Sequence, residues 1–93
     1  MSNFLDSKIF DLTIFTPSNI FLTIKVKSVV IPSVVGPFQV LVNHAPIIAA
    51  MGQGIVKVVD ENNNKENYLI SSGITELHHN QLTLTVSNIN KTN

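Results

Sequence analysis

Residues 75–86 read TELHHNQLTLTV, and this stretch decides the fold class. Side chains suited to a protein interior recur at every second position on each side of a central bend: Thr75, Leu77, Leu82, Leu84 and Val86. Because side chains of a β-strand alternate between two faces, these residues turn inward and the polar residues between them turn toward water. His79-Asn80 supplies the bend. The stretch therefore predicts a β-hairpin with one buried face.

The same alternation occurs at residues 10–15 and 20–27, and residues 55–59 and 67–70 are further predicted strands. Turn-forming residues separate these runs, and the polar stretch 60–65 predicts a hairpin loop. β-Branched residues dominate, and no window has an apolar stripe of helical period. We therefore predict an all-β chain, folded as a two-layer β-sandwich or flattened barrel of roughly eight to ten short strands.

The segment that ends at Pro32 carries two further predictions. Alternation places four apolar side chains on one side of its first half: Ile20, Leu22, Ile24 and Val26. The run Val29-Val30-Ile31 stops at Pro32, because proline has no N–H to donate to a sheet.

Length and composition limit both the fold and the function. The chain has 93 residues, of which 44% are hydrophobic, and this is enough for one core. It contains no cysteine, which excludes a disulfide framework and a Cys-based zinc site. Six lysines balance six acidic residues, so we expect no basic patch for nucleic acid. We predict a single domain over residues 1–88 and a polar C-terminal tail over residues 89–93.

The sequence carries no signal for membrane insertion or export. Its apolar runs are far shorter than the roughly 20 residues that a membrane-spanning helix requires. The N-terminal residues lack the charged start and apolar run of a leader. We therefore expect the chain to work in the compartment where it is made.

Candidate catalytic and metal-binding histidines are few. His78 and His79 are adjacent, so on a strand their side chains would point to opposite faces and could not bind one metal ion. We expect them to be an exposed turn pair. His44 has no sequence signature of a nucleophile or carboxylate partner. Its expected role is either a corner hydrogen bond or a contact with another subunit.

Two further motifs are interpreted as turns. Ser71-Ser72-Gly73 lacks the preceding glycine and the strand-to-helix context of a nucleophile elbow. Asp60, Glu61 and Glu66 flank three asparagines, but without the ordered spacing of a calcium loop, so we expect a solvated hairpin tip. No glycine-rich phosphate loop occurs. We predict no catalytic residue, no cofactor and no metal site.

A second stretch identifies a family. Residues 36–46 read GPFQVLVNHAP, which resembles the central motif of epsilon subunits of F-type ATP synthases, usually Gly-x-Phe-Gly-Val-Leu-Pro-x-His-Ala-Pro. Four shorter matches stand in the family's order: Thr16-Pro17, Val29-Val30-Ile31-Pro32, Gly54-Ile55-Val56 and Ser72-Gly73. The resemblance extends from about Phe10 to Val86.

The resemblance implies a non-catalytic subunit of the central stalk. Such a subunit clamps the gamma subunit and seats it on the c-ring of the membrane sector, so that a proton or sodium flow is coupled to ATP synthesis. It is peripheral on the cytoplasmic side of the bacterial inner membrane or, if organelle-encoded, on the matrix or stromal side. The alternative is a free-standing carbohydrate- or peptide-binding sandwich, although one Tyr and no Trp provide few aromatic platforms for a glycan.

The resemblance also implies contact residues. The positions expected to contact the gamma subunit are Thr16, Ala45, Ile48 and Gln53, on one face of the sandwich and along residues 44–53. The positions expected to contact the c-ring are Val35, Gly36, Pro37, Phe38 and His44. The apolar run 47–51 is consistent with burial by a partner, or with a central strand buried within the monomer.

Four departures from the family motif change what is expected. Gln39 replaces a glycine, so the backbone there should not need a positive φ. Val42 replaces the usual proline and keeps a backbone donor. Residues 34–37 stand where many relatives carry acidic side chains, so a flatter apolar contact replaces an electrostatic one. The C-terminal helical hairpin of most members has no counterpart before Asn93, so we expect no inhibitory function.

Overall fold

The computed structural model describes residues 8–92 of the chain, and within this range it contains nine β-strands. They are β1 (Phe10–Thr16), β2 (Asn19–Ile31), β3 (Phe38–Val40), β4 (Ile47–Met51), β5 (Gly54–Asp60), β6 (Lys65–Ile70), β7 (Gly73–His78), β8 (Gln81–Val86) and β9 (Ile89–Thr92). No helix in this range has the length and apolar character that a membrane crossing needs.

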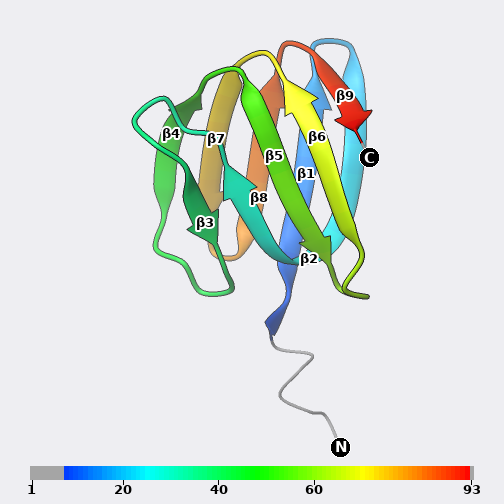
Figure 1. The fold of residues 1–93 in the computed structure, drawn as a ribbon. Helices are drawn as coiled ribbons and strands as arrows, with labels where there is room; N and C mark the ends of the chain where they lie inside the picture. The colour runs from blue at the N-terminus through cyan, green and yellow to red at the C-terminus, as the bar shows by residue number, and fades with distance from the viewer. Residues whose placement is uncertain (1–7, 93) are drawn as a thin grey trace, which may run out of the picture.

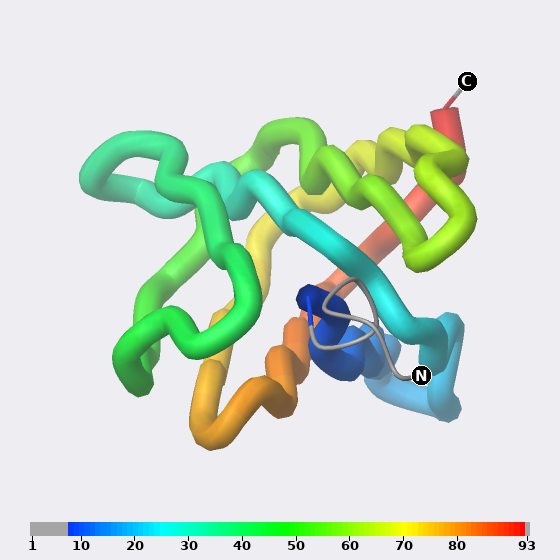
Figure 2. Tube along the Cα trace, turned by 90° about the horizontal axis from the view of Figure 1, so that it is seen from below, coloured from blue at the N-terminus to red at the C-terminus, as the bar shows by residue number. Residues whose placement is uncertain are grey.

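The strands form one sheet that folds over on itself into two layers. Its order is β4-β7-β8-β1-β2-β5-β6-β9, and β3 pairs with β2. β2 is 13 residues long, and its first half pairs with β1 while its second half pairs with β3 and β5. One layer therefore contains β4, β7, β8 and β1, the other contains β3, β5, β6 and β9, and β2 runs diagonally between them (Figures 1 and 2).

The core lies between the two layers and follows the predicted alternation. Its buried apolar residues are Phe10, Leu12, Ile14, Val26, Val29, Ile31, Val40, Met51, Val56, Val58, Tyr68, Ile70, Leu77, Leu82, Leu84 and Val86. Burying one such Val, Leu or Ile side chain contributes about 1.5–3 kcal/mol. The predicted all-β sandwich is therefore confirmed, as is the inward face of the 75–86 hairpin.

The turn of that hairpin has the backbone that its sequence suggests. His79 and Asn80 both have positive φ, at 50° and 60°, as a two-residue turn of type I′ requires. The turn lies between β7 and β8, which pair from Gly73↔Val86 to His78↔Gln81.

The prediction for the first half of β2 is only partly right. Val26 is fully buried, and Leu22 and Ile24 pack against the core. Ile20 is instead 58% exposed. The register of β1 and β2 shifts at Ile14/Phe15, and such a bulge moves the residues beyond it to the other face.

The predicted polar tail is wrong. Residues Ile89–Thr92 form β9, which pairs antiparallel with β6 from Asn67↔Thr92 to Ile70↔Ile89. The polar composition of residues 89–93 indicated a tail, but a β-ladder is held by backbone hydrogen bonds, which need no apolar side chain. Ile89 also packs against the core, and Lys91 forms a salt bridge of 2.8 Å with Glu66.

Candidate partner-binding surfaces

The loop between β2 and β3 presents two valines to solvent. Val34 is 64% exposed and Val35 is 91% exposed. Ser33 shapes the turn, because its Oγ accepts a hydrogen bond from Val35 N at 3.2 Å and its carbonyl accepts one from Gly36 N at 3.0 Å. Gly36 has φ of 129°, a conformation that other residues rarely adopt. The loop therefore displays an uncharged apolar tip from a fixed backbone.

The corner between β3 and β4 is fixed by backbone and amide hydrogen bonds. His44 Nδ1 donates to the Ala45 carbonyl at 2.7 Å, and His44 N donates to the Leu41 carbonyl at 3.2 Å. The His44 ring lies 6.3 Å from the ring of Phe38. The corner hydrogen bond expected for His44 is thus present, while its contact with another subunit stays a prediction.

An asparagine pair joins this corner to the β7–β8 turn. Asn43 N donates to Asn80 Oδ1 at 2.7 Å, and Asn80 Nδ2 donates to Asn43 Oδ1 at 3.0 Å. Asn43 has φ of 65°, which asparagine tolerates better than most residues. No local pattern in the sequence predicts this pair, because its members are 37 positions apart.

β4 lies at an edge of the sheet, so the interpretation as a central strand buried within the monomer is wrong. It forms a ladder with β7 alone among the described strands, and Figure 1 shows it at the left-hand border. Ile47 packs against the core, whereas Ile48 points outward and is 76% exposed. The sequence could not distinguish burial by a partner from burial as a central strand, because an apolar run can form either an edge strand or a central strand of a sheet.

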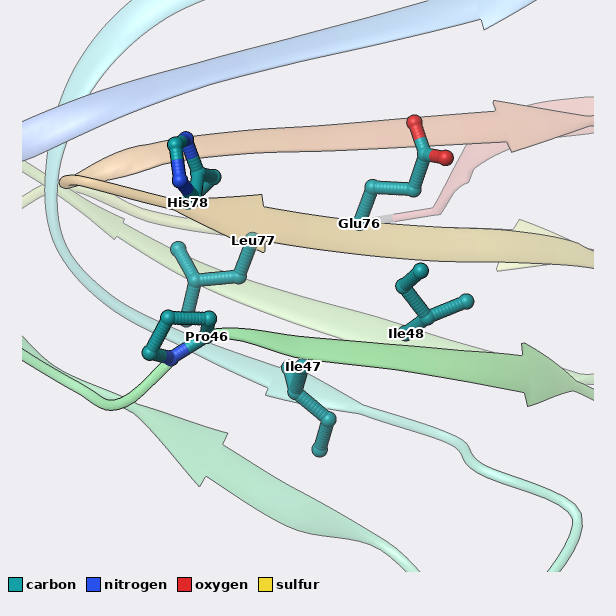
Figure 3. Close-up of a pocket in the computed structure, with 6 residues that line it drawn as sticks. All are labelled: Pro46, Ile47, Ile48, Glu76, Leu77 and His78. Atoms are coloured by element: carbon teal, nitrogen blue, oxygen red, sulfur yellow. The ribbon is translucent and has the colours of Figure 1, made fainter.

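An open groove runs along β4 and β7. Its volume is about 590 Å³, and it is lined by Pro46, Ile47, Ile48, Glu76, Leu77 and His78 (Figure 3). Ile48 and Glu76 are paired across the two strands, so their side chains lie on the same outer face. The groove is mostly apolar and opens to solvent.

The outer face beside this groove carries one row of side chains without charge. Strand register places five side chains in one row across it: Ala50, Ile74, Thr85, Phe15 and Ile20. Ile74 is 44% exposed and Ile20 is 58% exposed. These residues are not among those predicted from the sequence, although apolar side chains at outward positions of alternating strands are a signal for such a surface.

The four positions expected to contact the gamma subunit border this face without forming one cluster. Ala45 precedes β4, Ile48 lies on it and Gln53 follows it, so the outer two are about 26 Å apart along an extended chain. Thr16 ends β1, three strands away from β4, a separation of about 14 Å. The positions expected to contact the c-ring fall in the β2–β3 loop, at the start of β3 and in the next corner.

His78 and His79 are both exposed at the β7–β8 turn, as expected. The rings of His78 and His79 stack, with centroids 4.0 Å apart and planes 13° apart, rather than pointing to opposite faces. The reason is that His79 lies in the turn with φ of 50°, where strand alternation no longer applies. Among the described residues, no group of three or more His, Cys, Asp or Glu could hold a metal ion.

The two motifs interpreted as turns are turns. Ser71 and Ser72 connect β6 to β7. In the β5–β6 loop, Asp60 Oδ1 accepts hydrogen bonds from Asn62 N at 2.8 Å and from Asn64 N at 2.9 Å. These bonds, that from Asn64 first, lower the pKa of the Asp60 carboxyl. The carboxylate is therefore used to hold the loop.

Comparison with known proteins identifies the family. The family model for the ATP synthase delta/epsilon chain, beta-sandwich domain, matches residues 9–91. The chain belongs to this family. The earlier resemblance to epsilon subunits is confirmed, and the chain is an epsilon-type, non-catalytic subunit of the membrane-associated ATP synthase complex.

Individual relatives agree. An ATP synthase epsilon chain of Chlorobaculum tepidum is 35% identical over 77 residues, which cover 83% of this chain and 88% of that relative. An ATP synthase epsilon chain of Rickettsia typhi is 41% identical over 83 residues, which cover 86% of this chain and 76% of the relative.

Two solved structures support the fold. A chain in the mitochondrial ATP synthase of Euglena gracilis, solved with OSCP, F1 and c-ring, matches with a TM-score of 0.85 and 22% identity over 91% of this chain. A chain in the central stalk and c-ring of the Tetrahymena thermophila enzyme matches with a TM-score of 0.75 and 14% identity over 86% of this chain. The protein spans 54% and 64% of those two chains.

Proposed function

We propose that the chain is the rotor component that clamps the gamma subunit and seats it on the c-ring, and so couples a proton or sodium flow to ATP synthesis. The observation that carries this proposal is the bare apolar edge at β4, where Ile48 is 76% exposed. An exposed apolar surface of this kind on a small domain marks a site of association. The proposed location of the subunit is peripheral, on the cytoplasmic side of a bacterial inner membrane.

The gamma subunit is proposed to cover β4 and the outer face beside it. Of the contact positions, Ile48 lies on this face together with the exposed Ile74, and Thr16, Ala45 and Gln53 border it. A rotor must transmit torque without slipping, and close-packed apolar surfaces resist deformation. Glu76 is the acidic side chain of the groove, so most of the contact would not depend on charge.

The c-ring is proposed to meet the β2–β3 loop and the corner beyond it. The contact positions are Val35, Gly36, Pro37, Phe38 and His44. Val34 and Val35 form an uncharged tip, so this contact would be apolar and insensitive to ionic strength, because screening acts on charges. The close approach of the Phe38 and His44 rings joins the two parts of this surface.

The proposed gamma contact is tested by an affinity pull-down with two variants. Ile48→Asp adds a charge to the exposed edge and should abolish recovery of the gamma subunit by tagged protein. Leu69→Asp is the matched control, because Leu69 is an exposed apolar residue of β6 in the other layer. Recovery of gamma by the Ile48→Asp protein, or equal loss with both variants, would refute the assignment.

The ring contact is tested separately. Pro37 lies in an exposed loop, so Pro37→Asp should weaken assembly with the membrane ring while the melting temperature of the isolated domain stays nearly unchanged. If the isolated domain unfolds instead, Pro37 is a determinant of the fold and the surface assignment is wrong. A wild-type protein recovered without ATP synthase subunits, but bound to a glycan column, would favour the free-standing binding module.

A further inference from the structure

Three strands in the described part of the chain have a side without a neighbouring strand, and β4 differs from the other two. β3 has three residues, and β9 carries Asn90 and Lys91. Short length and charged side chains are the usual protections of a sheet edge against a further strand. β4 reads Ile-Ile-Ala-Ala-Met and has no such protection. Its edge is suited to pairing.

The backbone groups that face this edge can be assigned from the hydrogen bonds at the end of β4. Val34 N donates to the Ala50 carbonyl at 3.0 Å, and Gly52 N donates to the Pro32 carbonyl at 3.1 Å. Both groups therefore point away from β7. Because backbone groups alternate along a strand, the N–H and C=O of Ile48 point the same way. Ile48 thus offers one donor and one acceptor to a neighbouring strand.

The side chains beside this edge suit an extended apolar segment. Ile48 stands out from the edge, and the groove next to it is lined by apolar Pro46, Ile47 and Leu77. Figure 3 shows Glu76 and His78 along β7, where they add polar groups to the groove. Backbone pairing with alternate side chains in pockets is the general mode of strand addition.

The length of free edge limits what can pair there. Ser33 already forms a bridge with Met51, so an added strand must turn away opposite Ala50. Antiparallel pairing of two copies of this chain about Ile48 would place the second copy's Ala45 opposite Met51, where Ser33 lies. The edge therefore favours a short strand from a different protein over a second copy.

We propose that a short extended segment of the gamma subunit adds to β4 as an extra strand and exchanges two backbone hydrogen bonds with Ile48. This inference rests on the proposed function and specifies how the gamma contact is made. The proposed contact positions agree with it, since Ala45 precedes β4, Ile48 lies within it and Gln53 follows it. The added strand would extend the first layer by one strand beyond β4.

Hydrogen exchange of the protein, alone and bound to purified gamma subunit, tests the pairing directly. The Ile48 amide should exchange freely in the isolated protein and become protected in the complex. The Ala49 amide should be protected in both, because it faces β7. If gamma binds and the Ile48 amide still exchanges as in the isolated protein, strand addition is refuted while the proposed function stands. If gamma does not bind, both fail.

Two substitutions at one position separate the backbone from the side chain. Ile48→Ala removes the side chain and keeps the N–H, whereas Ile48→Pro also removes the N–H. Proline is tolerated at an edge where the N–H faces solvent, and circular dichroism checks that both variants fold. The gamma Kd of Ile48→Pro should be at least about five-fold weaker than that of Ile48→Ala, because a buried carbonyl of gamma loses its donor. Equal Kd values for the two folded variants would overturn the inference, and so would protection of Ile48 in a dimer of the chain without gamma.

Discussion

Gly73 offers the sharpest test of how closely β7 and β8 approach each other. It begins β7 opposite Val86, and a Cβ added there would lie 2.2 Å from the Thr85 carbonyl oxygen. Ordinary contacts between heavy atoms are about 3.5–4.0 Å, so Gly73→Ala requires the end of β7 to move by more than about 1 Å. The Met51 Cε atom, 3.0 Å from the same Cβ, blocks part of that movement.

We expect Gly73→Ala to reduce the free energy of unfolding by about 1–3 kcal/mol, the usual penalty of overpacking a well-packed site. For a domain of this size, this lowers the melting temperature by at least about 4 °C. Urea denaturation followed by circular dichroism measures both variants against wild type. Gly52→Ala is the matched control, because its Cβ would meet only Val34 Cγ1 at 3.6 Å; it should be neutral or stabilising by up to about 1 kcal/mol. A Gly73→Ala protein as stable as Gly52→Ala would refute the close approach of β7 and β8.

Three further predictions concern polar groups. Asn80→Ala should reduce the free energy of unfolding by about 1–3 kcal/mol in urea denaturation, because it removes both hydrogen bonds to Asn43 and the preferred residue of a positive-φ turn. Asn80→Gly should recover part of this loss, because glycine adopts a positive φ readily. Equal stability of the two variants would contradict a contribution of the turn conformation to the loss. Thr75→Val should be neutral or stabilising in a thermal melt, because Thr75 Oγ1 is buried without a partner among the described residues; a clear fall in melting temperature would show that the hydroxyl is bonded. The lowered pKa of Asp60 means that this carboxylate contributes stability above its unfolded value of about 3.9, and that the contribution is lost as the pH falls through the lower folded value. Asp60→Asn should therefore show less acid dependence of the urea midpoint than wild type between about pH 5 and pH 2, and an unchanged profile would contradict the loop's hydrogen bonds.

The sequence predicted those parts of the fold that depend on local alternation. Leu82, Leu84 and Val86 face inward because a strand's side chains alternate, and this needs no knowledge of what the strand pairs with. The replacement of glycine by Gln39 likewise predicts a backbone without a positive φ, and the φ of Gln39 is not positive. Both inferences use information carried by neighbouring residues.

The parts that failed depend on pairing between distant segments or on turn geometry. β9 is polar and pairs with β6, about twenty residues earlier, so its composition could not reveal it. The edge position of β4 follows from the strand order, and an apolar run carries no information about that order. The stacking of His78 on His79 depends on the backbone of a turn, where the period of two ends.

Ile48 and Val35 are proposed contact positions because positions of the family motif carry over to this sequence one by one. Their exposure of 76% and 91% depends on the folded sheet and could not be read from the chain. The exposed row through Ile74 and Ile20 was missed for the same reason, since its members come from separate strands.

Single-cysteine cross-linking inside the assembled ATP synthase tests the central claim most directly. The chain has no cysteine of its own, so Ile48→Cys and Val35→Cys each report one surface without background. We expect Ile48→Cys to cross-link to the gamma subunit, Val35→Cys to cross-link to a c subunit, and the control Leu69→Cys to cross-link to neither. Cross-links that are exchanged between the two surfaces, or equal for all three positions, would contradict the central claim.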